Sequence, residues 1–308
     1  MTLAILFPGQ GSQSLGMMQG YADLPVVEQT FREASALVQV DYWKMVTEGP
    51  AEALNQTVNT QPVMLIAGVA CWRAWLEKGG AMPAYFAGHS LGEYTALVAS
   101  GAMRFEDAVP LVRFRAQAMQ EAVPEGTGGI AAILGLDEPA IREVCAAAAQ
   151  GEVIEPANLN SPGQIVIAGH RTAVERGMAL AKEKGAKRAI MLPMSAPSHC
   201  SLMKPAADRL AERLARVAIT KPGAPVVQNR DVEAFEDPDR IRRALVEQLY
   251  NPVRWIETVQ YLTGHGVTRL VECGPGKVLA GLSKRLAGDA EVLSLNDSAA
   301  LAAAATQG

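Results

Sequence analysis

Residues 85–100 read YFAGHSLGEYTALVAS, and this stretch decides the fold class. Its opening residues, 85–87, are short and apolar, as in a buried strand, and residues 93–100 continue as a helix that ends at Gly101. Between them stands GHSLG, a G-x-S-x-G sequence placed where a strand turns sharply into a helix. A strand followed directly by a helix is the repeating unit of an α/β protein.

The same alternation recurs on both sides of this stretch. Residues 3–7 form a short apolar run that enters a glycine-rich loop. Further strand-like runs lie at 225–228 and 267–273, and helical patterns lie at 63–77 (opened by Gln61-Pro62), 105–123, 205–217, 239–250, 252–265 and from 277 onward. This alternation predicts a mostly parallel, buried sheet. The Ala-rich residues 299–305 are expected to form a frayed helix.

A different pattern occupies residues 125–195. Strand-like runs at 130–134, 153–159, 164–168 and 187–192 enclose helical patterns at 137–149 and 172–184. The order βαββαβ is that of the ferredoxin-like unit. The prediction is therefore a large α/β core, α/β-hydrolase-like in its parallel sheet, made of residues 1–124 and 196–308, with an inserted ferredoxin-like subdomain at 125–195.

Composition excludes several classes of protein. The 308 residues are 49% hydrophobic and 19% charged, which rules out a disordered chain. The net charge of −4 and the absence of a Lys/Arg run give no reason to expect nucleic-acid binding. The longest apolar run, residues 63–72, is too short to cross a membrane, and no signal peptide is expected. Four widely separated cysteines indicate neither zinc nor disulfides, so a reducing, cytoplasmic setting is expected.

Ser90 is the predicted nucleophile. On a sharp turn its hydroxyl stands clear of the backbone, and glycines at 88 and 92 remove side chains that would block the crossing of strand and helix. The alternative is an ordinary glycine-containing turn with a capping serine.

A serine nucleophile needs a base, and the chain has four histidines. His89 adjoins Ser90, so its side chain diverges and is expected to pack or hydrogen-bond locally. His170 and His265 are interpreted as surface or capping residues. His199 lies where the chain returns from the insertion to the core, and loops at such junctions commonly line clefts. We therefore expect His199 to be the base.

An oxyanion hole needs two donors. The backbone N–H of Leu91, directly after the nucleophile, supplies one. The loop at residues 9–12, after the first strand, is placed to supply the other. Its alternative interpretation is a phosphate cradle or a plain tight turn, but it lacks G-x-G-x-x-G spacing and a lysine.

Five motifs stand in order along the chain: FPGQGSQ at 7–13, GHSLGEY at 88–94, Arg115 in the run to Met119-Gln120, PSH at 197–199 and QLYNPV at 248–253. Together they resemble the malonyl-CoA:acyl carrier protein transacylase family, the loading enzymes of dissociated bacterial fatty-acid synthesis. The similarity covers essentially the whole chain, including residues 123–127, 160–169 and 272–277.

The resemblance implies particular roles for five residues and one region. Ser90 would be acylated, His199 would be its base, and a backbone carbonyl from the Gln248 region would orient the imidazole in place of a carboxylate. The backbone amides of Gln10 and Leu91 would form the oxyanion hole.

Arg115 would hold the free carboxylate of malonate, while the nearby Arg113 is expected to be a surface or structural residue. An Arg binds a carboxylate through two parallel hydrogen bonds. A buried Arg without an anion costs roughly 3–5 kcal/mol, which disfavours acetyl against malonyl by on the order of a hundredfold or more.

The implied reaction is ping-pong acyl transfer from malonyl-CoA to the phosphopantetheine thiol of acyl carrier protein, through a malonyl-serine. No metal or redox cofactor is expected, since coenzyme A and phosphopantetheine enter as parts of the substrates. The partners implied are malonyl-CoA and acyl carrier protein, with no nucleic acid and no membrane, and the chain is expected to be a monomer. The residues before His199, Ala196-Pro197-Ser198, follow the stand-alone bacterial pattern and favour malonyl.

Two other functions remain open. A serine esterase or thioester hydrolase, including one that edits wrong acyl groups, would share Ser90 and His199 but would not need Arg115, and Asp107 and Asp137 resemble helix caps, not a third triad member. A carrier-protein docking module is the non-enzymatic alternative. Candidate residues for steering an acidic carrier protein are Lys182, Lys184, Lys187, Arg188, Lys277, Lys284 and Arg285.

Overall fold

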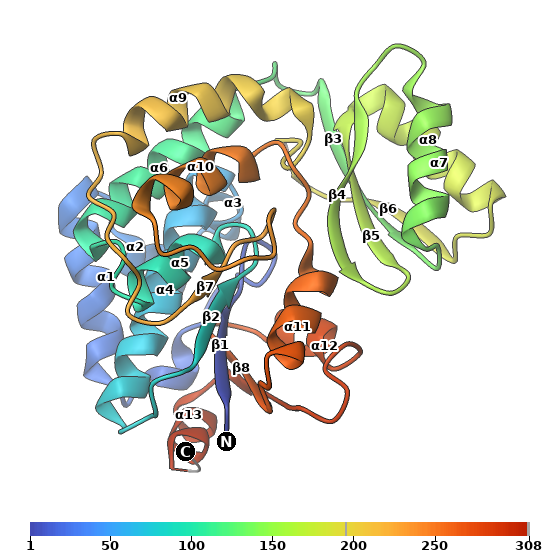
Figure 1. The fold of residues 1–308 in the computed structure, drawn as a ribbon. Helices are drawn as coiled ribbons and strands as arrows, with labels where there is room; N and C mark the ends of the chain where they lie inside the picture. Colours follow the sequence, from blue (N-terminus) through green and yellow to red (C-terminus); the bar gives the residue numbers. More distant parts are fainter. Residues whose placement is uncertain (195, 307–308) are drawn as a thin grey trace.

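Nine strands form two separate sheets in the computed structural model, which describes residues 1–194 and 196–306 (Figure 1). The first is a five-stranded parallel sheet with the order β7-β2-β1-β8-β9. Its strands are β1 (Leu3–Phe7), β2 (Tyr85–Gly88), β7 (Val226–Val227), β8 (Arg269–Cys273) and β9 (Glu291–Leu295). All residues of β1 and β8 are buried, as expected for a parallel sheet covered on both faces, although only β1 is continuously apolar and β8 also buries Arg269 and Glu272.

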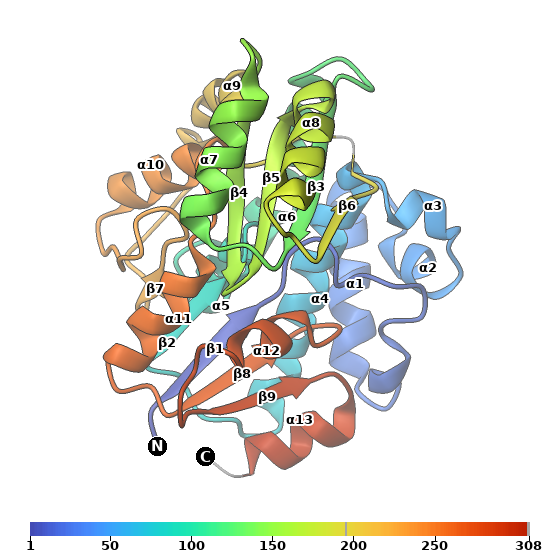
Figure 2. The same ribbon diagram turned by 90° about the vertical axis from the view of Figure 1, so that its right-hand side faces the viewer.

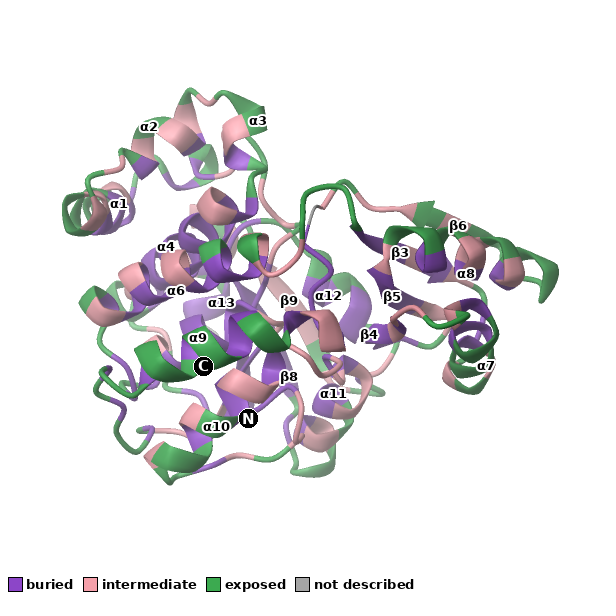
Figure 3. Ribbon diagram, turned by 90° about the horizontal axis from the view of Figure 1, so that it is seen from above, coloured by how far each residue is buried: buried purple, intermediate pink, exposed green. Residues whose placement is uncertain are grey.

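Helices cover both faces of this sheet. One face packs against a large apolar core that includes α1 (Pro25–Val38), α2 (Tyr42–Thr47), α3 (Ala51–Leu54), α4 (Thr57–Glu77), α5 (Gly92–Ala99), α6 (Phe105–Glu121), α9 (Lys204–Leu214), α10 (Pro238–Gln248) and α13 (Ser298–Ala305). The other face packs against α11 (Trp255–Gly264) and α12 (Val278–Ser283). Short 3-10 turns lie at η1 (Gln19–Tyr21) and η2 (Ser201–Met203). Seen from above, the buried residues face inward between these layers and the exposed residues face outward (Figure 3).

The second sheet is antiparallel, with the order β4-β5-β3-β6. Its strands are β3 (Gly128–Leu134), β4 (Ile154–Ser161), β5 (Gln164–His170) and β6 (Arg188–Met191). Two helices, α7 (Glu138–Ala149) and α8 (Arg171–Glu183), cover one of its faces (Figure 2). The chain order is β3-α7-β4-β5-α8-β6, and Ser195, the expected last residue of the insertion, lies outside the described residues.

The two sheets are joined by direct contacts from β4. The backbone of Val253, just before α11, pairs with β4. Its N–H donates to the carbonyl of Ala157 at 2.9 Å, and its carbonyl accepts from the N–H of Leu159 at 2.9 Å. The carboxylate of Glu155 accepts from both the backbone N–H and the hydroxyl of Ser201, each at 2.8 Å. These contacts turn the uncovered face of the antiparallel sheet toward the carboxyl ends of β1 and β2.

Three expected elements differ from the structure. The helix expected from residue 63 begins at Thr57 and contains Pro62, because sixteen of the residues of α4 are buried and their packing outweighs the hydrogen bond that proline cannot make. The helix expected from residue 252 begins at Trp255, because the backbone of Val253 pairs with β4 instead. The helix at the C-terminal end is not frayed: Asp297 caps α13 and Leu301 is fully buried.

Four elements were not anticipated from the sequence. They are β9 and the helices α1 to α3, and of these α1 carries an amphipathic pattern in the sequence, with Val27, Phe31 and Ala34 buried. Among the described residues, no helix combines the length and apolar character that a membrane crossing requires.

Glu272 holds the start of α12 against the end of β8. Its buried carboxylate accepts from the N–H groups of Leu279 at 3.1 Å and Ala280 at 2.7 Å. Burial raises the pKa of Glu272 to about 7, although the backbone donors oppose the shift. The folded protein therefore binds more protons than the unfolded chain between about pH 4.5 and 7, so this residue's contribution to stability falls as the pH rises through that window.

We expect Glu272→Gln to remove this pH dependence. The free energy of unfolding of the variant, measured relative to wild type by urea denaturation, should rise by roughly 3 kcal/mol between pH 4.5 and 7. Glu77→Gln, at an exposed residue, is the control and should keep a constant difference from wild type. A constant difference for Glu272→Gln as well would show that burial does not shift this carboxyl group.

Candidate active site

Ser90 lies at the turn between β2 and α5, where two glycines allow a very close crossing. A Cβ at Gly88 would lie 1.9 Å from the carbonyl carbon of Gly92, and a Cβ at Gly92 would lie 2.0 Å from the carbonyl oxygen of Phe7. No side chain fits at either position. Ser90 itself has φ of 51°, in the left-handed region that costs a non-glycine residue about 1–3 kcal/mol. The turn thus presents the Ser90 hydroxyl at the carboxyl ends of the parallel strands.

The structure brings His199 to this hydroxyl, from 109 positions away in the sequence. The distance from Ser90 Oγ to His199 Nε2 is 2.7 Å, and the distance from His199 Nδ1 to the backbone oxygen of Gln248 is 2.8 Å. A carbonyl oxygen only accepts, so Nδ1 carries the proton and Nε2 is free to accept from the serine hydroxyl. This is the tautomer that a general base for Ser90 requires.

The electrostatic surroundings keep the His199 ring neutral. Burial, and after it the positive charge of Arg115, lower the pKa of His199 to about 3, although the Gln248 carbonyl opposes the shift. The imidazole is therefore unprotonated at all ordinary pH values.

The other three histidines lie away from the Ser90 hydroxyl. His89 Nε2 lies 2.8 Å from Asn160 Oδ1 of β4, and its ring contacts that of Trp255. His170 is the residue before α8, and its Nδ1 accepts from the N–H of Val153. His265 follows α11 and its ring bonds to the Tyr261 carbonyl. His265 thus lies at a helix end, as expected, whereas His89 bonds to the second sheet and not locally, and His170 precedes α8 without capping it through its side chain.

Two residues with backbone N–H groups that are unpaired within the described part of the chain line the same pocket as the serine, namely Leu91 and Gln10. The loop that carries Gln10 packs directly against the turn between β2 and α5, since a Cβ at Gly9 would lie 2.5 Å from the His89 carbonyl oxygen. The Gln10 side chain is held separately, accepting from the Thr57 hydroxyl at 3.0 Å. Two unengaged donors beside a nucleophile are the elements of an oxyanion hole.

Arg115 extends from α6 into the same site and is 1% exposed. Its guanidinium donates to Gln61 Oε1 at 2.5 Å, to Gln248 Oε1 at 2.9 Å and to Ser90 Oγ at 3.3 Å. It lies over the ring of Tyr94, and its Nε has no partner. Within the described residues no carboxylate forms an ion pair with it.

A buried cation bonded only to neutral groups is an unsatisfied site for an anion. Burial lowers the pKa of Arg115, with Tyr94 and Glu93 opposing the shift. The carboxyl group that acts on its pKa is that of Glu93, whose own pKa is raised to about 7 by burial. A small carboxylate entering beside Ser90 is a stronger acceptor for the guanidinium than either glutamine amide.

These residues line a pocket of about 1050 Å³ between the two sheets. Its floor carries the loops after β1 and β2, and its roof is the uncovered face of the antiparallel sheet, including Ile130, Ala132 and Val166. Val278, Leu279 and Leu282 of α12 complete one wall. A pocket at the carboxyl ends of parallel strands is the usual ligand position in such folds.

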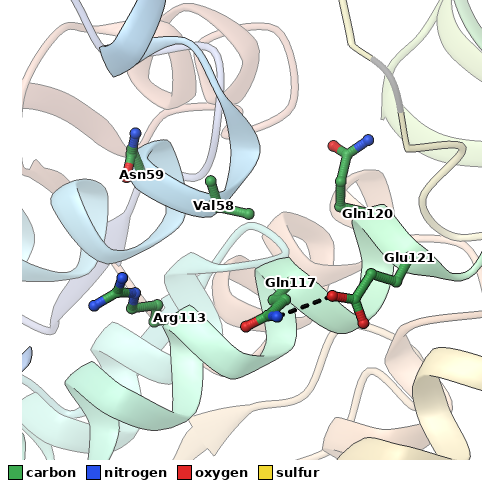
Figure 4. A pocket seen from close by; sticks show the side chains of 6 residues that line it. All are labelled: Val58, Asn59, Arg113, Gln117, Gln120 and Glu121. Atoms are coloured by element: carbon green, nitrogen blue, oxygen red, sulfur yellow. Dashed lines mark hydrogen bonds between the residues drawn. The ribbon is translucent and has the colours of Figure 1, made fainter. Parts of the chain in front are cut away.

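A second, smaller hollow of about 340 Å³ lies on the outer side of α6 (Figure 4). Its lining residues are Val58, Asn59, Arg113, Gln117, Gln120 and Glu121. Gln117 bonds to Glu121 at 2.9 Å, and Arg113 donates to the Val38 carbonyl at 2.9 Å. Arg113 thus has the structural position expected for it, and the hollow holds none of the predicted site residues.

Two polar residues of the site were missed by the sequence reasoning. Gln61 bonds to Arg115 from the start of α4, and Asn229 bonds to the backbone on both sides of His89. Asn229 follows a strand-like run of the parallel sheet, and that position was the available signal for it. Gln61 carries no such signal, because it adjoins a proline that was interpreted as a helix start.

The chain is similar to known proteins over nearly its whole length. The model of the family described as "Acyl transferase domain" matches residues 5–291. The "Malonyl CoA-acyl carrier protein transacylase" of Salmonella typhimurium is 56% identical, over 99% of each chain, and that of Escherichia coli K12 is 55% identical over 98% of each. The structure of the enzyme of this name from Coxiella burnetii has a TM-score of 0.98 at 48% identity and covers 100% of this chain and 98% of its own.

A further solved structure is similar over 100% of both chains, with a TM-score of 0.97 and 52% identity. It is described as a type II PKS acyl-carrier protein in complex with its malonyl-transacylase.

The charge of Arg115 should help to determine the pH below which Ser90 loses its reactivity. Replacing it by Gln removes a cation that lowers the His199 pKa, so that pKa should rise. The rate at which a fluorophosphonate modifies Ser90, measured from pH 4 to 8, should be nearly flat for wild type. For Arg115→Gln the rate should begin to fall at a higher pH. Arg113→Gln is the matched control, and superimposable profiles for all three proteins would contradict the assignment.

Proposed function

We propose that this chain, which belongs to the acyl transferase family and within it to the malonyl CoA-acyl carrier protein transacylases, loads malonyl groups from coenzyme A onto acyl carrier protein. The reaction is a ping-pong transfer through a malonyl-serine. One observation carries the proposal: a buried arginine without an acidic partner lies 3.3 Å from the hydroxyl of a serine that is bonded to a neutral histidine.

In the first half-reaction Ser90 Oγ attacks the thioester carbonyl of malonyl-CoA. His199 Nε2 takes the hydroxyl proton, and the backbone N–H groups of Leu91 and Gln10 stabilise the oxyanion. The carbon–sulfur bond then breaks, and the imidazolium returns its proton to the coenzyme A thiolate. The Gln248 carbonyl keeps Nδ1 protonated throughout, and it supports the imidazolium that forms between the two proton transfers.

The second half-reaction runs the same steps in reverse with a new thiol. His199 takes the proton of the phosphopantetheine thiol, the sulfur attacks the ester carbonyl of malonyl-Ser90, and the departing serine oxygen regains the proton. Acyl carrier protein is the partner that supplies this thiol. A related solved structure described as a carrier protein in complex with its malonyl-transacylase supports this choice. No further cofactor is required, because the pantetheine arm belongs to the substrates.

Arg115 selects for an acyl group that ends in a carboxylate. The guanidinium is held at its position by Gln61 and Gln248, so it is oriented before substrate arrives. A malonyl carboxylate would give the cation an anionic partner, whereas an acetyl group would leave it with neutral partners only. The same contact holds the acyl chain in place while the carrier thiol attacks.

The proposal includes a finer description of the fold. The parallel sheet belongs to an α/β-hydrolase-like core, residues 1–124 and 196–308, and residues 125–195 form a ferredoxin-like subdomain. The strand order β4-β5-β3-β6 and the two helices on one face support the second assignment. A monomer in a reducing, cytoplasmic setting completes the proposal, and the four unpaired, buried cysteines support that setting.

Intact-protein mass spectrometry tests the intermediate. Mixing the chain with malonyl-CoA and no carrier protein should give a malonyl adduct on Ser90 that is absent from Ser90→Ala. Adding carrier protein should discharge the adduct onto its thiol. Release of free malonate without an adduct would point to an editing hydrolase, and neither adduct nor turnover would leave the docking-module interpretation.

Arg115→Ala tests acyl selection in the same assay. The ratio of loading rates for malonyl-CoA and acetyl-CoA should fall by on the order of a hundredfold, because the charged contact favours only malonyl. Arg113→Ala, two positions away on the same helix, should keep the wild-type ratio. An unchanged ratio in Arg115→Ala would remove this residue from substrate selection.

The surface around α12 is the expected steering patch for the acidic carrier protein. Lys277, Lys284 and Arg285 are exposed beside the helix that lines the pocket, whereas Lys184 is paired with Glu143 at 2.6 Å. The double variant Lys284→Glu, Arg285→Glu should raise the KM for carrier protein, with the KM for malonyl-CoA little changed. Lys182→Glu, Lys184→Glu is the control pair, and an equal effect in both pairs would contradict this location.

A further inference from the structure

The Ser90 turn leaves two backbone groups that the sheet and helix do not satisfy. Gly88 is the last residue of β2, and the partner strand β7 ends at Val227, level with Ala87. The carbonyl of Gly88 and the N–H of Ser90 therefore lie beyond the end of the β7 ladder. The Gly88 carbonyl is buried and the Ser90 N–H is partly buried, and an unpaired buried polar group costs about 1–3 kcal/mol.

A single side chain pairs both groups. Asn229 donates from Nδ2 to the Gly88 carbonyl at 2.6 Å, and its Oδ1 accepts from the Ser90 N–H at 2.6 Å. The amide thereby acts in place of a further residue of β7, bridging the peptide groups on either side of His89. Asn229 is itself fully buried.

The position of Asn229 is fixed from two directions. Its backbone N–H donates to Glu93 Oε2 of α5 at 2.7 Å, and its carbonyl accepts from the N–H of Arg254 at 3.2 Å. Glu93 lies in α5, three residues after Ser90. The helix that begins at the Ser90 turn therefore also holds Asn229, whose side chain bonds to that turn.

We propose that Asn229 is a positioning residue for Ser90, one that holds the left-handed turn of the nucleophile and so directs its hydroxyl at His199. The inference rests on Ser90 being the nucleophile of the proposed function. Asn229 touches neither the reacting atoms nor the pocket, and it acts through the two peptide groups alone. Its bond to the Ser90 N–H opposes relaxation of φ from 51° to a negative value, together with the bond that Gln248 Nε2 donates to the Ser90 carbonyl at 3.0 Å.

The neighbouring residue provides a matched control. Gln228 is equally buried and also carries a side-chain amide, but that amide bonds to the Val226 carbonyl at 3.2 Å and not to the elbow. Removing either amide from this segment should have a similar effect on packing. Only the loss of Asn229 should change the direction of the Ser90 hydroxyl.

Asn229→Ala and Gln228→Ala are compared with wild type by two readouts. The first is the rate of Ser90 modification by a fluorophosphonate, and the second is malonyl loading from malonyl-CoA. Asn229→Ala should lower the modification rate and the kcat of malonyl loading by on the order of a hundredfold each, with the KM for malonyl-CoA little changed. Gln228→Ala should stay near wild type in both.

Asn229→Asp gives a sharper test. The Asp side chain has nearly the same shape as that of Asn, but it can donate a hydrogen bond only when it is protonated, which depends on pH. A protonated Asp donates from its hydroxyl to the Gly88 carbonyl and accepts from the Ser90 N–H, which restores both bonds. An ionised Asp places an oxygen against the Gly88 carbonyl and repels it. Fluorophosphonate modification of Asn229→Asp should therefore accelerate as the pH falls from 8 to 5, whereas wild type and Asn229→Ala should show no such rise.

The charged groups around residue 229 determine the pH range over which the introduced Asp titrates. Glu93 of α5 faces the backbone of residue 229, and Asp231 and Arg230 follow it in the chain. Arg254 lies against its carbonyl, and Arg115, His89 and His199 surround the Ser90 turn. Burial and the carboxylate of Glu93 both favour a protonated Asp, so its transition should fall above that of an exposed aspartate.

Three results would overturn the inference: a wild-type modification rate in Asn229→Ala, an equal loss in Gln228→Ala, or a pH profile of Asn229→Asp parallel to wild type. The isosteric Asp variant keeps the test decisive if the Ala variant does not fold. Failure of the proposed function is distinguishable, because wild type would then react with the fluorophosphonate and not load malonyl.

Discussion

The crossing of β2 and α5 at Ser90 is the constraint on which the rest of the site depends. The two glycines at 88 and 92 leave no room for a Cβ, so the strand and the helix approach to backbone contact. That contact forces Ser90 into the left-handed region and lifts its hydroxyl out of the sheet. The strain is held by the helix that follows, by the loop after β1 packed against the His89 carbonyl, and by the side chain of Asn229.

Around this turn the site is organised by neutral acceptors and one cation. The carbonyl of Gln248 orients His199, and the side-chain oxygens of Gln248 and Gln61 hold Arg115. One glutamine therefore links the base and the cation through its backbone and its side chain. Because Arg115 has no anionic partner among the described residues, its charge stays available to an incoming carboxylate. Burial, helped by the same charge, keeps the neighbouring imidazole unprotonated.

The antiparallel sheet contributes to the site through contacts that its own fold does not require. β4 pairs with the backbone of Val253, its Asn160 bonds to His89, and its Glu155 holds Ser201, two residues after His199. The segment carrying the base is thus tied to the second sheet, while the nucleophile belongs to the first. Their 2.7 Å separation depends on how the two sheets are joined.

The sequence alone determined the alternation of strands and helices, the elbow at residues 88–92, the family resemblance and the identity of the five residues now found around the pocket. The alternation and the sharp turn are local properties, because turn geometry and apolar periodicity are set by near neighbours, whereas the roles of Arg115 and of the Gln10 amide were implied by the resemblance. Without the resemblance, the choice of His199 among four histidines had only its place at a chain junction to support it. The start of α4, the pairing of Val253 and the packing of α13 were wrong or missed, since burial by distant segments outweighs local propensity there. Only the tertiary structure decided that Gln61 and Asn229 belong to the site, because each acts through hydrogen bonds to residues far away in the chain.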